Sequence, residues 1–189
     1  MEYNYEEFKR ILKERLTEKR YIHSLAVADE AKRLAAKYGA DQTKAYTAGL
    51  LHDITKNTEK NEQLKILNDF GIILDNVSKN AEKLWHAITG SVYIKNVLHI
   101  DDTEIIDAVR YHTTARENMS LLEKILYLAD FTSADRDYDD VDVMRKKVDI
   151  SIEEAMKYAL SYTIKELVDK QGQIHPDTFN AYNEVMKRS

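Results

Sequence analysis

Residues 41–53 read Asp-Gln-Thr-Lys-Ala-Tyr-Thr-Ala-Gly-Leu-Leu-His-Asp, and this stretch decides how the chain is interpreted. Apolar residues in it lie three positions apart, as on one face of a helix: Ala45, Ala48 and Leu51. Asp41 or Thr43 can cap the start of that helix. The apolar run then ends in a histidine and an aspartate, His52 and Asp53, so a predicted helix delivers two polar groups to the inside of the molecule.

The same helical period continues on both sides of this stretch. Further apolar segments with helical spacing, or capping signals that open a helix, are Phe8 to Leu16, Val27 to Tyr38, Leu64 to Phe70, Leu84 to Val97, Asp101 onward, Ser120 onward, Ser151 to Gly172, and Pro176 onward. Gly39 and Gly71 occupy C-cap positions. No stretch shows the period-two alternation of a strand. We predict an all-α fold with about eight or nine helices.

Composition limits the remaining possibilities. The chain has 189 residues, 43% of them hydrophobic, with one Pro and five Gly, and no linker-like stretch, so we expect a single domain over residues 1–189. A polar, acidic start and the lack of a long apolar run indicate a cytoplasmic protein with no signal peptide and no membrane segment. The net charge of −5 argues against nucleic acid as a partner but allows a small anionic substrate. A homodimer is left open.

Cysteine is absent, so a metal can be held only by histidine and carboxylate. Several such residues end or interrupt apolar helix faces: His23, His52, Asp53, His86, His112 and Asp130. Each inward histidine taken alone is more often an ordinary core residue than a ligand. A buried carboxylate is costly without a cation, however, and one metal would satisfy all of these residues together. Another histidine, His99, lacks such a context.

A ligand set of two histidines and two aspartates points to a transition metal. Imidazole suits Zn, Fe, Ni and Cu, and carboxylates add a preference for Mn and Fe. Other familiar sites are excluded by pattern, because the chain has no His-Glu-x-x-His, no Gly-x-x-x-x-Gly-Lys and no Glu-x-x-His.

The order His23, His52-Asp53, Asp130 resembles the HD superfamily of metal-dependent phosphohydrolases. Longer motifs resemble its YqeK subfamily: Ala48 to Lys56, Trp85 to Gly90, Tyr111 to Ser120, Glu123 to Asp130, Ala134 to Tyr138 and Ile174 to Thr178. These motifs lie between about Arg20 and Asn183. The bare His-Asp pair is a weak signal, whereas this ordered series is a specific one.

The resemblance implies an HD-type helical bundle that cleaves dinucleoside tetraphosphates symmetrically, with diadenosine tetraphosphate giving two ADP molecules, and with iron as the typical metal. It implies metal ligation by His23, His52, Asp53 and Asp130, with His52 and Asp53 at the catalytic centre. His86 and His112 would lie beside the metal, as ligands of a second ion or, as we favour, as phosphate contacts. The nucleotide contacts would include Thr113, Arg136, Ile174, His175 and Pro176.

Lys56, Arg116 and Arg136 lie near these motifs and could neutralise phosphates. Arg136 is the strongest candidate, Lys56 is balanced between a site role and a surface role, and Arg116 is expected to be a solvated surface charge.

Four other functions remain to be weighed. A guanosine tetraphosphate hydrolase would carry two acids after the His-Asp pair, where this chain has Ile54, Thr55 and Lys56. Another HD nucleotidase stays open, and a cyclic-dinucleotide phosphodiesterase lacks its Gly-Tyr-Pro signature here. A non-catalytic nucleotide-binding regulator would be expected to have lost ligands, and this chain keeps all of them.

Overall fold

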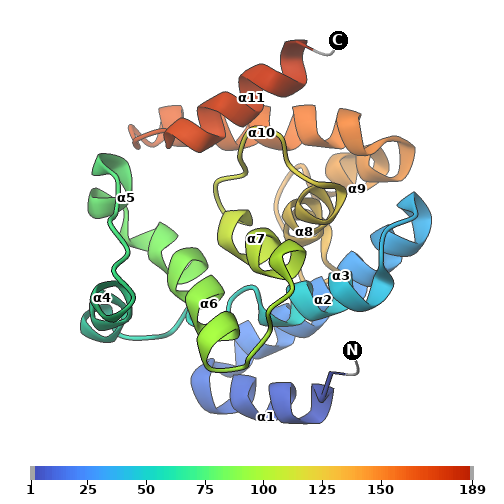
Figure 1. Ribbon diagram of the computed structural model, residues 1–189. Coiled ribbons are helices and arrows are strands. Elements are labelled where there is room, and N and C mark those ends of the chain that lie inside the picture. The colour runs from blue at the N-terminus through green and yellow to red at the C-terminus, as the bar shows by residue number, and fades with distance from the viewer. Residues whose placement is uncertain (1–2, 188–189) are drawn as a thin grey trace.

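The computed structural model describes residues 3–187, and within them every regular element is a helix (Figure 1). The elements are α1 (Tyr5–Arg15), α2 (Glu18–Tyr38), α3 (Gln42–Leu51), α4 (Lys60–Asp69), α5 (Asn76–Asn80), the 3-10 helix η1 (Glu82–Leu84), α6 (Trp85–Asn96), α7 (Thr103–Tyr111), α8 (Leu121–Thr132), α9 (Val141–Ile150), α10 (Ile152–Asp169) and α11 (Pro176–Lys187). The predicted all-α class is confirmed.

Several helix boundaries follow directly from the capping residues. Gly39 ends α2 in the left-handed region, at a φ of 76°, where a side chain would be strained. Asp41, rather than Thr43, caps α3, because its carboxylate accepts from the backbone N–H groups of Thr43 and Lys44. Ser120 and Glu123 satisfy each other's backbone N–H groups in a capping box at the start of α8.

The expected number of helices was too low, because α5 and α9 were not predicted. Helix α5 has only five residues, too few to show a period. Helix α9 begins after Asp140, whose side chain makes no capping hydrogen bond. It is also separated from α10 by Ser151 alone, so no loop marks its end.

A close approach of α2 and α3 organises the centre of the molecule. Gly49 of α3 faces α2 so closely that a Cβ atom there would lie 2.7 Å from the Cα of Ala28. The buried residues around this contact are small, including Ala31, Ala45 and Ala48. Helices α2 and α3 both pack against α8, and α3 also packs against α7. These four helices enclose the point at which the predicted site residues meet.

A second, smaller apolar cluster lies apart from the main core. It consists of Leu67, Trp85 and Ile88, with Ile72 and Leu74 packed against it. Helix α4 reaches the rest of the protein mainly through α6, and Figure 1 shows α4 and α5 together at one side of the bundle. The segment from α4 to α5 is therefore a small lobe beside the main core.

Helix length alone does not indicate a membrane segment here. Helices α2 and α10 are the longest, with 21 and 18 residues, and both carry many charged side chains. No helix within residues 3–187 combines the length and the apolar character needed to cross a bilayer.

Candidate metal centre

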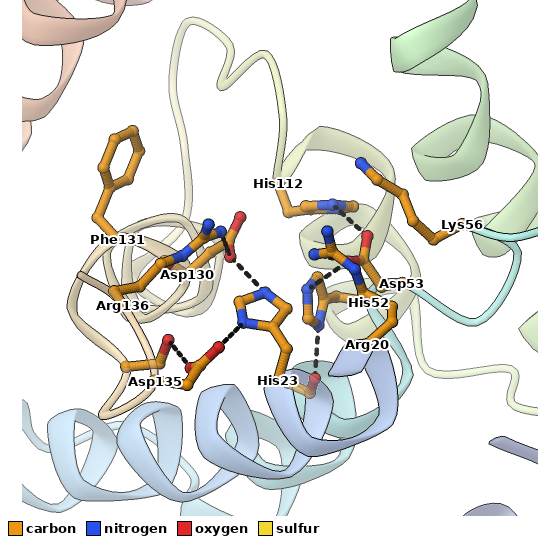
Figure 2. A network of polar contacts seen from close by, with 12 residues as sticks. Arg20, His23, His52, Asp53, Lys56, His112, Asp130, Phe131, Asp135 and Arg136 are labelled. Carbon is orange, nitrogen blue, oxygen red and sulfur yellow. Dashed lines mark hydrogen bonds and ion pairs between the residues drawn. The ribbon is translucent and has the colours of Figure 1, made fainter. Parts of the chain in front are cut away.

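Five of the predicted site residues converge between α2, α3, α7 and α8 (Figure 2). Potential ligand atoms of His23, His52 and Asp130 lie within 4.8 Å of one another. A second group within the same limit consists of His52, Asp53 and His112. Because His52 belongs to both groups, they form one continuous cluster that holds all four predicted ligands together with His112.

Two of these histidines are oriented by the helix that precedes them. His52 follows the last residue of α3, and its Nδ1 donates to the carbonyl oxygen of Gly49 at 2.7 Å. His112 follows the last residue of α7, and its Nδ1 donates to the carbonyl oxygen of Val109, also at 2.7 Å. Carbonyl groups in the last turn of a helix lack intrahelical partners. Each bond therefore satisfies a helix end and directs Nε2 of the same ring into the site.

The Nε2 atom of His52 is the clearest sign that a cation belongs in this cluster. His52 has no exposed surface, and Nε2 makes no hydrogen bond to any described residue. The nearest carboxylate oxygen, Oδ2 of Asp53, lies 3.4 Å away without hydrogen-bond geometry. Since Nδ1 carries the proton, Nε2 presents a buried lone pair, and leaving such an atom unpaired costs about 1–3 kcal/mol. Imidazole nitrogens beside two carboxylates fit a divalent transition metal.

Asp53 connects the cluster to two further basic side chains. Its Oδ2 accepts a hydrogen bond from Nη1 of Arg20 at 2.8 Å, and its Oδ1 lies 3.1 Å from Nε2 of His86. Burial alone raises the pKa of Asp53, but its histidine neighbours, His52 first, outweigh burial and hold the pKa well below its usual value. The carboxylate is therefore ionised at neutral pH, as a metal ligand must be.

Asp130 and His23 form the other side of the cluster. Oδ1 of Asp130 lies 2.9 Å from Nε2 of His23, and Arg136 donates both to this carboxylate and, at 2.6 Å, to the backbone carbonyl of Asp130. Burial alone raises the pKa of Asp130, but His23 and Arg136 outweigh it and hold the pKa well below its usual value. Arg136 thus contacts Asp130 in this structure, and its predicted contact with nucleotide stays a prediction.

Sequence reasoning missed two residues that touch the cluster. Arg20 lies one helical turn before His23 on α2, and that spacing was the available signal. Asp135 contacts Nδ1 of His23 through Oδ2 at 2.8 Å. It falls inside the Ala134–Tyr138 motif, yet it carries no helical period that would have indicated its partner.

His86 joins the network from α6. Its Nε2 lies 3.1 Å from Nε2 of His112, which is an acceptor because the other ring nitrogen of His112 donates to Val109. We assign the proton of His86 to Nε2, where it bonds to His112 and Asp53. The Nζ atom of Lys56 lies 3.2 Å from Nε2 and 3.4 Å from Nδ1 of His86, and with this tautomer only Nδ1 can accept from it. Burial lowers the pKa of His86 to about 4, so the ring is neutral at neutral pH.

Three cationic side chains surround the cluster. Lys56, Arg20 and Arg136 approach it from different elements (Figure 2). Burial is the main cause of the lowered pKa of Lys56, and the positive charges of Arg20 and Arg136 lower it further. These three cations lie beside three carboxylates, Asp53, Asp130 and Asp135, with Arg20 paired to Asp53 and Arg136 to Asp130.

Thr113 follows the ligand candidate His112 directly. Its hydroxyl oxygen is buried and makes no hydrogen bond to any residue among 3–187. The next residue, Thr114, accepts a 2.7 Å hydrogen bond from the hydroxyl of Thr178 through its backbone carbonyl. The start of α11 is therefore fastened beside the His112 turn, so two of the predicted substrate segments lie close together.

The predicted contact of His175 with nucleotide stays a prediction, and its ring nitrogens have other partners in this structure. Nε2 of His175 lies 3.0 Å from Oδ2 of Asp75 and 3.2 Å from the hydroxyl of Ser78. Nδ1 accepts the backbone N–H of Asp177. On either side, Ile174 is half-buried, whereas Pro176 is exposed.

Two basic residues discussed in the sequence analysis, Arg116 and His99, lie outside the cluster. Arg116 pairs with the buried carboxylate of Glu123 and stacks over the ring of Tyr111 at 4.5 Å. It is therefore a partly buried structural cation and not the solvated surface charge that was expected. His99 is exposed in the loop after α6 and belongs to neither ligand group.

Comparison with known proteins agrees with this geometry. A family model described as "HD domain" matches residues 20–135. A symmetrical bis(5'-nucleosyl)-tetraphosphatase from Bacillus subtilis is 36% identical over 98% of this chain and 100% of the relative. A relative of the same name from Staphylococcus aureus is 32% identical over 95% of this chain and 93% of its own length.

A solved structure extends the comparison to three dimensions. The crystal structure of a predicted HD superfamily hydrolase involved in NAD metabolism, from Clostridium acetobutylicum, is 38% identical to this chain. It superposes with a TM-score of 0.96 and covers 100% of both chains. The similarity inferred from the sequence motifs is thus confirmed over nearly the full length, and the chain belongs to the HD domain family.

Proposed function

We propose that this protein is a metal-dependent hydrolase that splits dinucleoside tetraphosphates symmetrically, converting diadenosine tetraphosphate and water into two ADP molecules. The observation that carries the proposal is the buried, unpartnered Nε2 of His52 within a cluster of imidazoles and ionised carboxylates. The curated relatives that bear the name of this activity match the chain almost from end to end.

His23, His52, Asp53 and Asp130 would hold the metal, and His112 is placed to join them. We propose iron, since the ligand types suit it and the YqeK subfamily is typically iron-associated. When bound, a divalent cation polarises a phosphoryl oxygen and lowers the pKa of a water that it binds. This chain supplies the ligand charge, because Asp53 and Asp130 are both ionised at neutral pH.

The cations around the cluster suit a polyphosphate. Four linked phosphates carry several negative charges, and Lys56, Arg20 and Arg136 all lie beside the residues that would hold the metal, where they would contact these phosphates. Arginine binds phosphate oxygens through a planar fork, which also fixes their orientation. The unpartnered hydroxyl of Thr113 and the neutral ring of His86 add uncharged hydrogen-bonding groups to the same site.

The proposed reaction breaks one phosphoanhydride bond. The oxygen of water forms a bond to one of the two inner phosphorus atoms, and the bridging oxygen between these two atoms leaves with the other half of the substrate. Each half is then a nucleoside diphosphate. Lys56 and the two arginines would hold the phosphates on either side of the bond that breaks, so that the inner phosphorus atoms lie at the metal ligands.

Product analysis tests this proposal directly. Diadenosine tetraphosphate incubated with the metal-loaded protein in ¹⁸O-water should yield ADP alone, with label on the terminal phosphate of one ADP in each pair. The formation of AMP and ATP would contradict symmetric cleavage. Binding of the substrate without turnover, after loading with Fe²⁺ or Mn²⁺, would favour the regulator, and faster cleavage of guanosine tetraphosphate or a mononucleotide would favour another HD phosphohydrolase.

A further inference from the structure

The loop that follows α8 touches the metal cluster at two points. Arg136 contacts the carboxylate of Asp130. Asp135 contacts the ring of His23 on the side opposite to Asp130 (Figure 2). Oδ2 of Asp135 lies 2.8 Å from Nδ1 of His23, whereas Nε2 of His23 faces Asp130. His23 is nearly fully buried, with a side chain 4% exposed, so Asp135 and Asp130 between them engage both of its ring nitrogens.

The three histidines of the cluster differ in what their Nδ1 atoms contact. His52 and His112 each donate to a backbone carbonyl of their own helix. His23 lies in the interior of α2, where the carbonyls are used by the helix itself, and its Nδ1 meets a carboxylate 112 residues further along the chain. A negatively charged acceptor makes an imidazole a better metal donor and fixes both its tautomer and its orientation.

We propose that Asp135 is a positioning residue of the metal centre: it accepts the Nδ1 proton of His23 and presents Nε2 of that ring as a ligand. Among residues 3–187, the ring nitrogens of His23 make polar contacts with Asp135 and Asp130 alone, and only Asp135 lies at Nδ1. The inference rests on the metal site proposed above.

The loop is built to hold Asp135 in place. The hydroxyl of Ser133 donates to the second carboxylate oxygen of Asp135 at 2.8 Å. Arg145 of α9 donates to the backbone carbonyls of Thr132, Ser133 and Arg136, at 3.2, 3.0 and 3.1 Å. Both oxygens of Asp135 are thus engaged, and the backbone on either side of it is clamped to a helix. Such support is what a ligand-orienting group requires.

Titration of the metal-free, full-length protein with Mn²⁺ tests the inference without relying on turnover. Asp135→Ala should weaken Mn²⁺ binding about 10- to 100-fold. Asp135→Asn should lie between Asp135→Ala and the unaltered protein, because the amide oxygen still accepts the hydrogen bond but carries no charge. Asp137→Asn is the matched control, since Asp137 is an exposed residue of the same loop whose side chain makes no hydrogen bond or ion pair with any residue among 3–187, and it should bind Mn²⁺ as the unaltered protein does.

A merely structural ion pair would give a different pattern. If Asp135 only fastened the loop to α2, Asp135→Ala would lower the urea midpoint of the metal-free protein and leave Mn²⁺ affinity unchanged. That result would overturn the inference, as would an equal loss of affinity in Asp137→Asn. We expect instead that Mn²⁺ shifts the urea midpoint of Asp135→Ala by less than it shifts that of the unaltered protein, whatever the midpoints without metal.

The same titration separates this inference from the proposed metal site. If the unaltered protein and His52→Ala bind Mn²⁺ equally, the metal site itself is wrong and the role of Asp135 falls with it. If His52→Ala loses the ion while Asp135→Ala keeps full affinity, the metal site stands and only the role of Asp135 is refuted.

Discussion

The imidazole of His52 and the backbone of Gly49 are joined by a 2.7 Å hydrogen bond at the point where α3 comes closest to α2. Gly49 therefore has two roles. Its lack of a side chain lets α3 approach Ala28 of α2, and its carbonyl fixes the ring that carries the unpartnered Nε2 atom. Because the ring centroids of His23 and His52 are 5.3 Å apart, the spacing of these two helices also sets the spacing of the two ligands.

Gly49→Ala should disturb both fold and metal site. A Cβ atom would lie 2.7 Å from the Cα of Ala28, so the helices must separate, and overpacking of this kind typically costs about 1–3 kcal/mol of unfolding free energy. Urea unfolding of the metal-free protein and titration with Mn²⁺ would measure the two effects. Gly172→Ala is the control, because its Cβ would meet Leu167 at 3.4 Å in an exposed turn. Equal behaviour of the two variants would refute this account.

Removal of a central ligand should abolish metal binding. His52→Ala and Asp130→Ala each delete a member of the first ligand group, and we expect both variants to lose the ion and nearly all turnover. Metal content after purification without chelator, measured beside diadenosine tetraphosphate hydrolysis, gives the answer. His99→Asn provides a control outside the cluster, since asparagine tolerates the positive φ of 54° at that position. Full metal content in both ligand variants would contradict the assignment.

Most of the fold could be predicted because its signals are local. Gly39, Asp41, Ser120 and Pro176 each mark a helix boundary through their own backbone or side-chain chemistry, and the structure places a helix end at each. The start of α9 offers no such signal, since its capping residue makes no side-chain bond. A helix boundary can therefore be predicted from the sequence only where a residue at that boundary caps or ends the helix.

The site residues also divide into those that the sequence could predict and those that it could not. His52 and His112 are oriented by carbonyls three residues earlier, and Asp53 adjoins His52, so residue order alone places them at helix ends. Arg20 and Asp135 act on partners 33 and 112 residues away. No periodicity connects such residues, because their contacts depend on how α2, α3 and the loop after α8 are packed.

His86 and His112 should respond differently to substitution. We favoured phosphate contacts for both from the sequence, but only His112 lies within a candidate ligand group, together with His52 and Asp53. His112→Ala is therefore expected to lower metal content or affinity. His86→Ala should keep the metal while kcat/KM falls steeply, because Lys56 and Asp53 lose a neutral partner. Metal analysis paired with steady-state kinetics distinguishes the two, and loss of an ion from His86→Ala would reverse the assignment.

The contact between α5 and α11 should depend on pH. Asp75 caps α5 by accepting from two backbone N–H groups through Oδ1, and its Oδ2 accepts from Ser78 at 2.5 Å and from His175 at 3.0 Å. Burial alone raises the pKa of Asp75, but its hydrogen bonds outweigh burial and hold the pKa well below the usual value of about 3.9. In acid the unfolded chain therefore binds a proton before the folded protein does, so this contribution to stability is lost as pH falls below about 4.

Asp75→Asn tests this contact, with Asp41→Asn as its matched control. Both residues cap a helix through one oxygen, and asparagine caps about as well as aspartate. In Asp75→Asn the amide nitrogen would replace Oδ2 and face two donors, the Ser78 hydroxyl and Nε2 of His175, so we expect a loss of about 1–2 kcal/mol at pH 7. Asp41→Asn should cost much less, since Asp41 makes no such second contact among the described residues.

Urea unfolding at several pH values measures the role of the charge. The deficit in unfolding free energy of Asp75→Asn should stay constant above about pH 5 and shrink below about pH 4. A deficit that persists unchanged at pH 3, or one that Asp41→Asn shares, would mean that the charge of Asp75 does not hold α5 against the start of α11.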